Sequence, residues 1–157
     1  IIVSQQLSVA SARAVWARVE TVLSPLTPER ILAADDEAMR LSGLSRPKQK
    51  AMRAVAAAIV EGRLRFDRLE AATAEEVHRH LTAVPGIGPW TADIYLLFCL
   101  GHRDGFAPAR VAFGLPARPV AAALEALAEP WRPWRGVAAR LLWADYAVLK
   151  SREGMNA

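Results

Sequence analysis

One stretch of the sequence, Pro85-Gly86-Ile87-Gly88-Pro89, has two glycines between two prolines. Pro85 cannot continue a helix because it lacks an N–H group, and Gly86 and Gly88 can supply the positive-φ and close-approach positions of a tight turn. Backbone N–H groups at such a turn are open to a phosphate, since no side chain stands in front of them. The stretch therefore predicts an anion-binding turn, although a plain hairpin whose glycines serve packing is the alternative.

Helices on both sides must position this turn. Thr73 and Glu76 have the spacing of a capping box, and Val77 and Leu81 form an apolar i, i+4 pair in the helix that follows. After the turn, Pro89 suits a first helical position, and residues 90–100 are mostly apolar and contain no helix breaker. A helix-hairpin-helix is therefore expected over about residues 74–100.

The rest of the chain also shows helical periodicity. Helices are expected over residues 8–23, from Thr27 onward, from Asp35 or Asp36 to before Gly43, and over 45–60, 120–127 and 136–150, with a brief turn at 66–69. The first should bury Val9, Val15, Trp16 and Val19, and the last Val137, Leu141 and Leu142. Because no strand-like alternation is present, the expected fold class is all-α, an orthogonal helical bundle.

The helix expected over 45–60 begins with a basic stretch, Ser45-Arg46-Pro47-Lys48, and Lys50 follows. Positive charge at a helix start opposes the helix dipole, and a nearby phosphate would compensate for it. A solvated surface face is the alternative.

Composition narrows the class of protein. The 157 residues suit one domain, the 53% of hydrophobic residues can form a core, and no long uncharged run could span a membrane. One cysteine, Cys99, cannot build a disulfide framework or a metal cage, which favours an intracellular protein. The net charge of +4 permits a polyanionic partner without proving one. With neither a signal peptide nor an initiator Met at Ile1, part of the natural protein is expected upstream.

The longer string Val-Pro-Gly-Ile-Gly-Pro-Trp-Thr-Ala-Asp, residues 84–93, is followed by Asp104 and Phe106. It resembles the helix-hairpin-helix (HhH-GPD) DNA glycosylase superfamily, and within it the 3-methyladenine DNA glycosylase II group. The resemblance implies an HhH-GPD domain over residues 1–157, truncated at its N-terminus. It also implies a base-excision repair enzyme that hydrolyses alkylated purines such as 3-methyladenine from double-stranded DNA. The single cysteine excludes the four-cysteine cluster of the endonuclease III branch.

The same resemblance assigns expected roles to residues. Gln6 would fill the space left by a flipped nucleotide with Gln5 beside it, although a solvated loop that caps a helix is the alternative. DNA phosphate would bind the turn formed by Pro85, Gly86, Ile87 and Gly88. The base pocket would have aromatic walls, with core packing as the alternative for each: Trp90, Tyr95 and Trp143.

No cofactor is expected to be required, but the resemblance implies that sodium or a similar ion could bind the carbonyls of Thr82, Val84 and Ile87. Trp90 stands where bifunctional relatives carry a lysine nucleophile. A monofunctional route is therefore implied, in which water attacks and a carboxylate stabilises the oxocarbenium-like sugar. The protein is expected to be a monomer, without membrane association, in the bacterial cytoplasm at the nucleoid.

The sequence departs from the family at the catalytic position. Aligned without gaps, the expected aspartate falls on Arg110, while Asp104 belongs to the family's loop pattern and Asp93 to the second hairpin helix. Either residues are absent between Ala109 and Arg110, or Arg110 is a true replacement. A true replacement would make the chain a noncatalytic DNA-binding or damage-sensing module. A helical protein-interaction domain is a third possibility.

Overall fold

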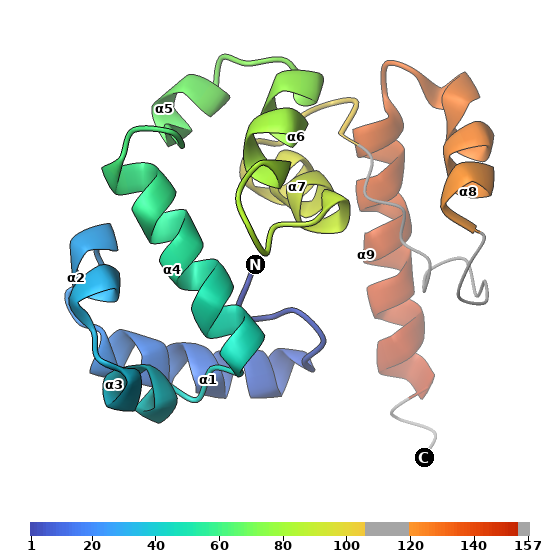
Figure 1. Cartoon of the computed structure of the whole chain (residues 1–157). Coiled ribbons are helices and arrows are strands. Elements are labelled where there is room, and N and C mark those ends of the chain that lie inside the picture. Colours follow the sequence, from blue (N-terminus) through green and yellow to red (C-terminus); the bar gives the residue numbers. More distant parts are fainter. Residues whose placement is uncertain (106–119, 154–157) are drawn as a thin grey trace. The chain divides into compact units, whose positions relative to one another are not determined.

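The computed structural model describes residues 1–105 and 120–153, with side chains described for 1–105 and 123–148. Every regular element in these ranges is helical (Figure 1), so the predicted all-α fold class is confirmed. The chain separates into two compact units, Ile1–Ala92 and Asp93–Ala157. Among the described helices, none is long and apolar enough to cross a membrane.

Most helices of the first unit begin at the residues that the sequence predicted. The unit contains α1 (Val9–Val22), α2 (Pro28–Ala33), α3 (Asp36–Leu41), α4 (Arg46–Val60), α5 (Phe66–Leu69), α6 (Ala74–Thr82) and the start of α7 (Pro89–Ile94). Side chains cap the starts of four of these helices: Ser8 caps α1, Thr27 caps α2, Asp35 caps α3 and Thr73 caps α6, and each accepts a hydrogen bond from a backbone N–H group of the first turn. Thr73 and Glu76 form the predicted capping box, whereas the Ser45 side chain makes no capping hydrogen bond to α4.

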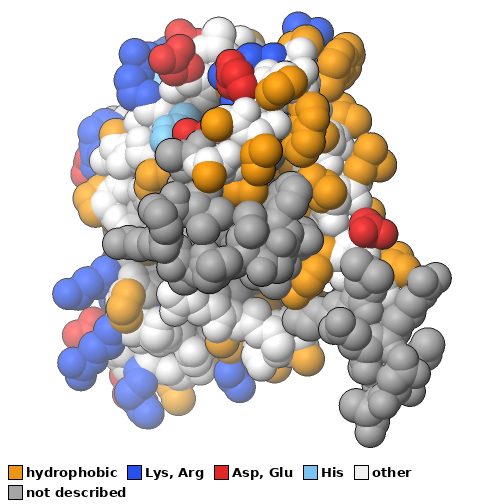
Figure 2. Space-filling view, turned by 90° about the vertical axis from the view of Figure 1, so that its right-hand side faces the viewer, with side chains coloured by type: hydrophobic (Ala, Val, Ile, Leu, Met, Phe, Trp, Pro, Cys, Tyr) orange, Lys and Arg blue, Asp and Glu red, His pale blue; other side chains and the backbone are white. Residues whose placement is uncertain are grey.

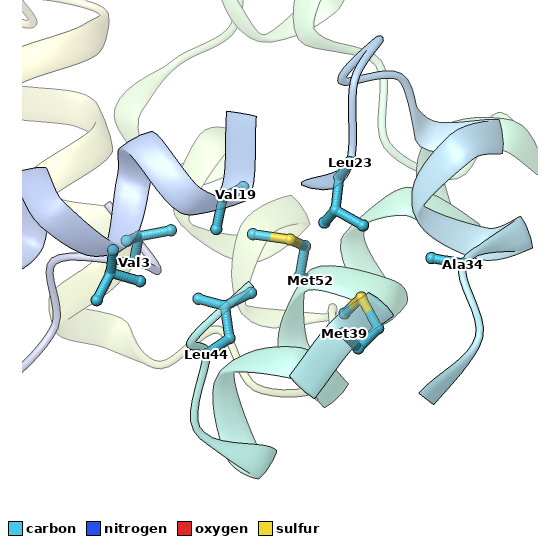
Figure 3. Close-up of a cluster of buried hydrophobic side chains, with 8 residues drawn as sticks. Val3, Val19, Leu23, Ala34, Met39, Leu44 and Met52 are labelled. Atoms are coloured by element: carbon cyan, nitrogen blue, oxygen red, sulfur yellow. The ribbon is translucent and has the colours of Figure 1, made fainter. Parts of the chain in front are cut away.

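A buried cluster joins the start of the chain to α1, α3 and α4 (Figure 3). Val19, Leu23 and Met39 are completely buried in it, and Val3, Leu44 and Met52 pack beside them. The prediction that Val9 and Trp16 belong to this core is wrong, because they are 69% and 41% exposed. Helical spacing alone placed them on the apolar side, but α1 buries only the narrower stripe that includes Val15 and Val19.

The second unit continues α7 into a π-helical segment, Tyr95–Cys99, in which the N–H of Leu100 donates to the Tyr95 carbonyl at 3.0 Å. After it come α8 (Val120–Ala128), a short 3-10 turn (Glu129–Trp131) and α9 (Arg135–Glu153). The second hairpin helix is therefore not one continuous α-helix through residue 100, as the absence of breakers suggested. A wider turn changes which side chains share a face of the helix.

The described part of the second unit contains a buried cluster. Leu97, Leu124, Ala128 and Ala139 form it, and Ile94 and Trp143 pack against it. The prediction that α9 buries Val137 and Leu141 is wrong, since these side chains are 44% and 67% exposed. Figure 2 views the molecule from the side of α8 and α9 and shows many hydrophobic side chains at that surface.

Candidate functional site

The turn between α6 and α7 is held by its own backbone. The N–H of Val84 donates to the Leu81 carbonyl at 3.1 Å, and the N–H of Ile87 donates to the Val84 carbonyl at 3.0 Å. The Gly88 carbonyl then accepts the N–H groups of two residues in α7. Because the Val84 and Ile87 side chains are buried, the turn is anchored in the first unit from both sides.

Gly86 and Gly88 differ in why they are glycine. Gly86 has a φ of +88°, and a Cβ placed on it would lie 2.7 Å from the Cβ of Ala51 in α4. Both predicted reasons for glycine therefore hold at Gly86. The same prediction is wrong for Gly88, whose φ is not positive and whose added Cβ would have no atom within 4 Å. Its missing side chain leaves the surface in front of the turn open.

Several backbone donors of the turn have no partner in the part of the chain that the structure describes. Among the described residues, no hydrogen-bond acceptor is found for the N–H groups of Gly86, Gly88 and Trp90, and all three residues are exposed. The carbonyls of Thr82 and Ile87 likewise accept no hydrogen bond within the described part of the chain. The turn thus offers free donors suited to an anion and free carbonyl oxygens suited to a cation. Both sites remain predictions.

The start of the chain is tied to the second hairpin helix. Gln5 donates from Nε2 to Oγ1 of Thr91 at 2.7 Å, and Thr91 is 7% exposed. On the other side, Nζ of Lys48 donates to the Val3 carbonyl at 2.8 Å. These two hydrogen bonds hold residues 3–5 between α4 and α7. Sequence reasoning named neither Thr91 nor Lys48 as an anchor, although Thr91 lies inside the quoted motif.

Gln6 is exposed and has a φ of +56°, in the left-handed region that non-glycine residues seldom adopt. Such a conformation costs about 1–2 kcal/mol and persists where the neighbouring structure imposes it. Here Gln5 is held by Thr91, and the helix cap at Ser8 follows directly. The structure therefore presents Gln6 from a strained, anchored turn, and its role against DNA remains a prediction.

The three predicted pocket walls lie in different units. Trp90 belongs to the first unit and is 45% exposed, whereas Tyr95 and Trp143 belong to the second. Trp143 contacts Phe98 edge-on at 6.5 Å between ring centroids, and Tyr146 edge-on at 6.2 Å.

Sequence reasoning did not single out Phe98 or Tyr146 as neighbours of Trp143. Tyr146 follows Trp143 by three residues on α9, a spacing that places the two side chains on one helix face. The indole N–H of Trp143 is buried, and no acceptor for it is found among the described residues. The three rings form an aromatic cluster in the second unit, and the role of Trp143 as a pocket wall remains a prediction.

The carboxylate of Asp104 forms ion pairs with two arginine side chains. It accepts two hydrogen bonds from Arg135, both at 2.8 Å, and one from Arg132 at 2.8 Å. The hydrogen bonds from Arg135 lower the pKa of Asp104, Coulombic attraction to Arg135 and Arg132 adds to the effect, and partial burial opposes it. The carboxylate therefore stays ionised but is already neutralised. This pairing fits the prediction that Asp104 is not the catalytic group.

The loop that carries Asp104 rests directly on the start of α9. The N–H of Gly136 donates to the Arg103 carbonyl at 2.8 Å, and a Cβ on Gly136 would lie within 3 Å of three carbonyl oxygens of this loop. Arg110 and the junction after Ala109, where residues were suspected to be absent, lie outside the described residues. Within the described part, no group of three His, Cys, Asp or Glu side chains could hold a metal ion.

Two helices joined by a glycine turn, within an all-helical chain, define a helix-hairpin-helix protein. The family model described as "HhH-GPD superfamily base excision DNA repair protein" matches residues 1–133. This match covers more than half of the chain, and the chain therefore belongs to that family.

Named relatives agree with this assignment. The chain is 32% identical to DNA-3-methyladenine glycosylase 1 of Schizosaccharomyces pombe, over 92% of this chain and 71% of the relative. Among solved structures, it resembles a DNA-3-methyladenine glycosidase from Bacillus halodurans with a TM-score of 0.77 and 34% identity, covering 96% of this chain and 74% of the other. It also resembles S. pombe Mag1 in complex with abasic DNA, with a TM-score of 0.79 and 29% identity, covering 90% and 75%.

Proposed function

We propose that this protein is a DNA glycosylase of base-excision repair that hydrolyses the N-glycosidic bond of alkylated purines such as 3-methyladenine. The observation that carries the proposal is the match of residues 1–133 to the HhH-GPD base-excision repair family. The hydrogen bond from Gln5 to Thr91 ties the turn that carries the exposed Gln6 to α7. Helix α7 begins directly after the free N–H groups of Gly86 and Gly88 in the hairpin. Family membership and the named relatives support the same activity.

An enzyme that acts on a base inside a duplex must first take the base out of the stack. The free N–H groups of Gly86, Gly88 and Trp90 suit a DNA phosphate, and the open space at Gly88 allows the backbone to approach. Gln6, on its strained turn, would fill the gap that the flipped nucleotide leaves. The first unit thus supplies both an anchor on the DNA backbone and a wedge.

An alkylated purine is electron-poor and carries positive charge, so aromatic faces attract it. Trp90 in the first unit and Trp143 with Tyr95 in the second are the aromatic groups assigned to this role. Phe98 and Tyr146 support the Trp143 ring by edge-on contacts. Aromatic groups in this role would favour cationic purines over ordinary bases.

In the proposed reaction water replaces the base at the sugar carbon, without a covalent enzyme intermediate. Trp90 occupies the position at which bifunctional relatives carry a lysine. A carboxylate should stabilise the positive charge that develops on the sugar. Asp104 is poorly suited because Arg135 and Arg132 already bind both of its oxygens.

The pairing of Asp104 with Arg135 and Arg132 favours a second candidate function. With Arg110 at the aligned catalytic position and Asp104 engaged, the chain would bind alkylated duplex DNA and leave the glycosidic bond intact. The two candidates share the hairpin, Gln6 and the aromatic residues. They differ only in whether base release follows binding.

A monovalent cation such as sodium would bind the carbonyls of Thr82, Val84 and Ile87. Thr82 and Ile87 have free carbonyl oxygens in the described structure, and Val84 uses its oxygen for one hydrogen bond only. An ion held there would add positive charge beside the bound phosphate. The chain's own N–H groups would still make the direct contacts.

The experiment that separates the candidates measures release of free base from duplex DNA containing 3-methyladenine, with undamaged duplex as the control. Release of 3-methyladenine that leaves an intact abasic strand supports the monofunctional glycosylase. Specific binding to the damaged duplex without release would overturn catalysis and support the damage-binding alternative. Light scattering on the same sample tests the proposed monomeric state.

A further inference from the structure

The first two turns of α4 carry three cations, Arg46, Lys48 and Lys50, and no acidic residue in the first turn. Lys48 is committed to the Val3 carbonyl. Arg46 and Lys50 are exposed, and no ion pair or hydrogen bond of either side chain is found within the described part of the chain. They are four residues apart, so they lie on one face of the helix and repel each other.

Most other arginines of the first unit's helices and turns have partners. Arg40 pairs with Glu37, Arg63 with Glu61 and Arg65 with Asp67, while Arg53 donates to the Ala34 carbonyl at 2.7 Å. Arg46 and Lys50, like Arg68, are exposed cations for which no partner is found in the described part of the chain. Arg46 also lies at the positive end of the α4 dipole, where a cation is unfavourable.

The placement of these two cations is fixed by contacts on both sides. Next to Lys50, Ala51 meets Gly86 of the hairpin, and between Arg46 and Lys50, Lys48 holds the Val3 carbonyl. Figure 1 shows the start of the chain close to both the hairpin and the beginning of α4. The exposed cations consequently lie on the helical turns that support both proposed DNA-contacting elements.

We infer that Arg46 and Lys50 form a third contact with DNA, an electrostatic one to the sugar-phosphate backbone of the duplex. The contact rests on the proposed function and deepens it. Cations that neutralise phosphates release counterions, so they strengthen binding irrespective of sequence and make the affinity depend on salt. This contact would bind undamaged and damaged duplexes equally. Gln6 and the aromatic residues would distinguish a damaged base from an ordinary one.

The test compares the salt dependence of duplex binding for the wild type and the double variant Arg46→Gln/Lys50→Gln. Loss of two phosphate contacts should make the slope of log affinity against log salt less negative by about 1.8, and lower the affinity at physiological salt roughly 10- to 30-fold. The variant should be at least as resistant to urea as the wild type, because a repulsive pair is removed. A loss of affinity would then not reflect unfolding.

The control is Arg63→Gln/Arg68→Gln, which removes two exposed positive charges near the opposite end of α4, one of them paired with Glu61. This control should keep the wild-type slope, and Arg46→Lys/Lys50→Arg should restore it. Equal slopes for the wild type and Arg46→Gln/Lys50→Gln would overturn the inference, as would an equal change in both glutamine variants. If the wild type shows no salt-dependent duplex binding at all, the proposed function fails as well.

Discussion

Gln5 and Thr91 are 86 positions apart in sequence, yet Nε2 of Gln5 lies 2.7 Å from Oγ1 of Thr91. Thr91 is almost fully buried, so its hydroxyl has little access to water as an alternative partner. This hydrogen bond connects the exposed turn at Gln6 to the helix that follows the hairpin. Two elements proposed to act on DNA are thereby held as one piece of the first unit.

Replacing Thr91 with Val keeps the shape of the side chain but leaves Gln5 without its acceptor. We expect the free energy of unfolding to fall by about 1 kcal/mol for Thr91→Val and for Gln5→Ala. The double variant should lose less than the sum, with a coupling energy of about 0.5–1.5 kcal/mol in a double-mutant cycle. Urea unfolding of the four proteins measures the coupling, and strict additivity would show that the two side chains do not interact.

Gly86→Ala and Gly88→Ala form a matched pair on the same turn. At Gly86 the new methyl group would meet Ala51 in a left-handed backbone conformation, so we expect a loss of about 2–4 kcal/mol of stability. At Gly88 the methyl group enters open space, and stability should change by less than about 0.5 kcal/mol.

For the folded proteins, we expect Gly88→Ala to weaken DNA binding more than Gly86→Ala does. Gly88→Ala places a methyl group between the free N–H groups and a phosphate, and affinity for duplex DNA should fall roughly tenfold, about 1.4 kcal/mol. Thermal unfolding and fluorescence anisotropy measure the two quantities. A Gly88→Ala protein with unchanged affinity would remove the hairpin surface as a phosphate site.

Gln6 permits a test that separates backbone strain from side-chain function. Gln6→Gly removes the side chain and relieves the left-handed strain, so stability should stay level or rise by about 0.5 kcal/mol. Gln6→Ala removes the side chain but keeps the strain. If Gln6 is the wedge, both variants should lose base release equally; activity that follows stability instead would contradict a wedge role.

The pair Asp104–Arg135 predicts a pH-dependent stability. The pKa of Asp104 is lowered in the folded protein, so the pair stabilises fully above the ordinary aspartate pKa of about 3.9 and progressively less as the pH falls below it. Arg135→Gln should cost roughly 2–4 kcal/mol at pH 7, because it leaves a partly buried carboxylate with one partner. The cost should shrink toward pH 2.

Arg132 offers the control for this prediction. Its side chain is 51% exposed, so water already screens its pairing with Asp104, and Arg132→Gln should cost less than about 1 kcal/mol. Urea unfolding at pH 7 and pH 3 gives both comparisons. A cost for Arg135→Gln that is the same at both pH values would show that packing, not charge, connects Asp104 to α9.

Local chemistry in the sequence determined the helix starts and the turn. The caps at Ser8, Thr27 and Thr73, the capping box with Glu76 and the break at Pro85 depend on neighbouring residues only, so spacing could predict them. That the hairpin binds an anion stays a prediction. Motif resemblance added the expected roles of Gln6 and the aromatic residues.

Contacts between distant residues were decided by the tertiary structure alone. Periodicity could not show that Trp16 and Leu141 stay exposed, because burial depends on which neighbouring helix covers each face. The sequence also does not distinguish Gly86 from Gly88, since only the packing of the hairpin on Ala51 makes one glycine necessary and leaves the other open. In the same way, folding brought Gln5 to Thr91 and Asp104 to Arg135, pairs whose hydrogen bonds no local pattern encodes.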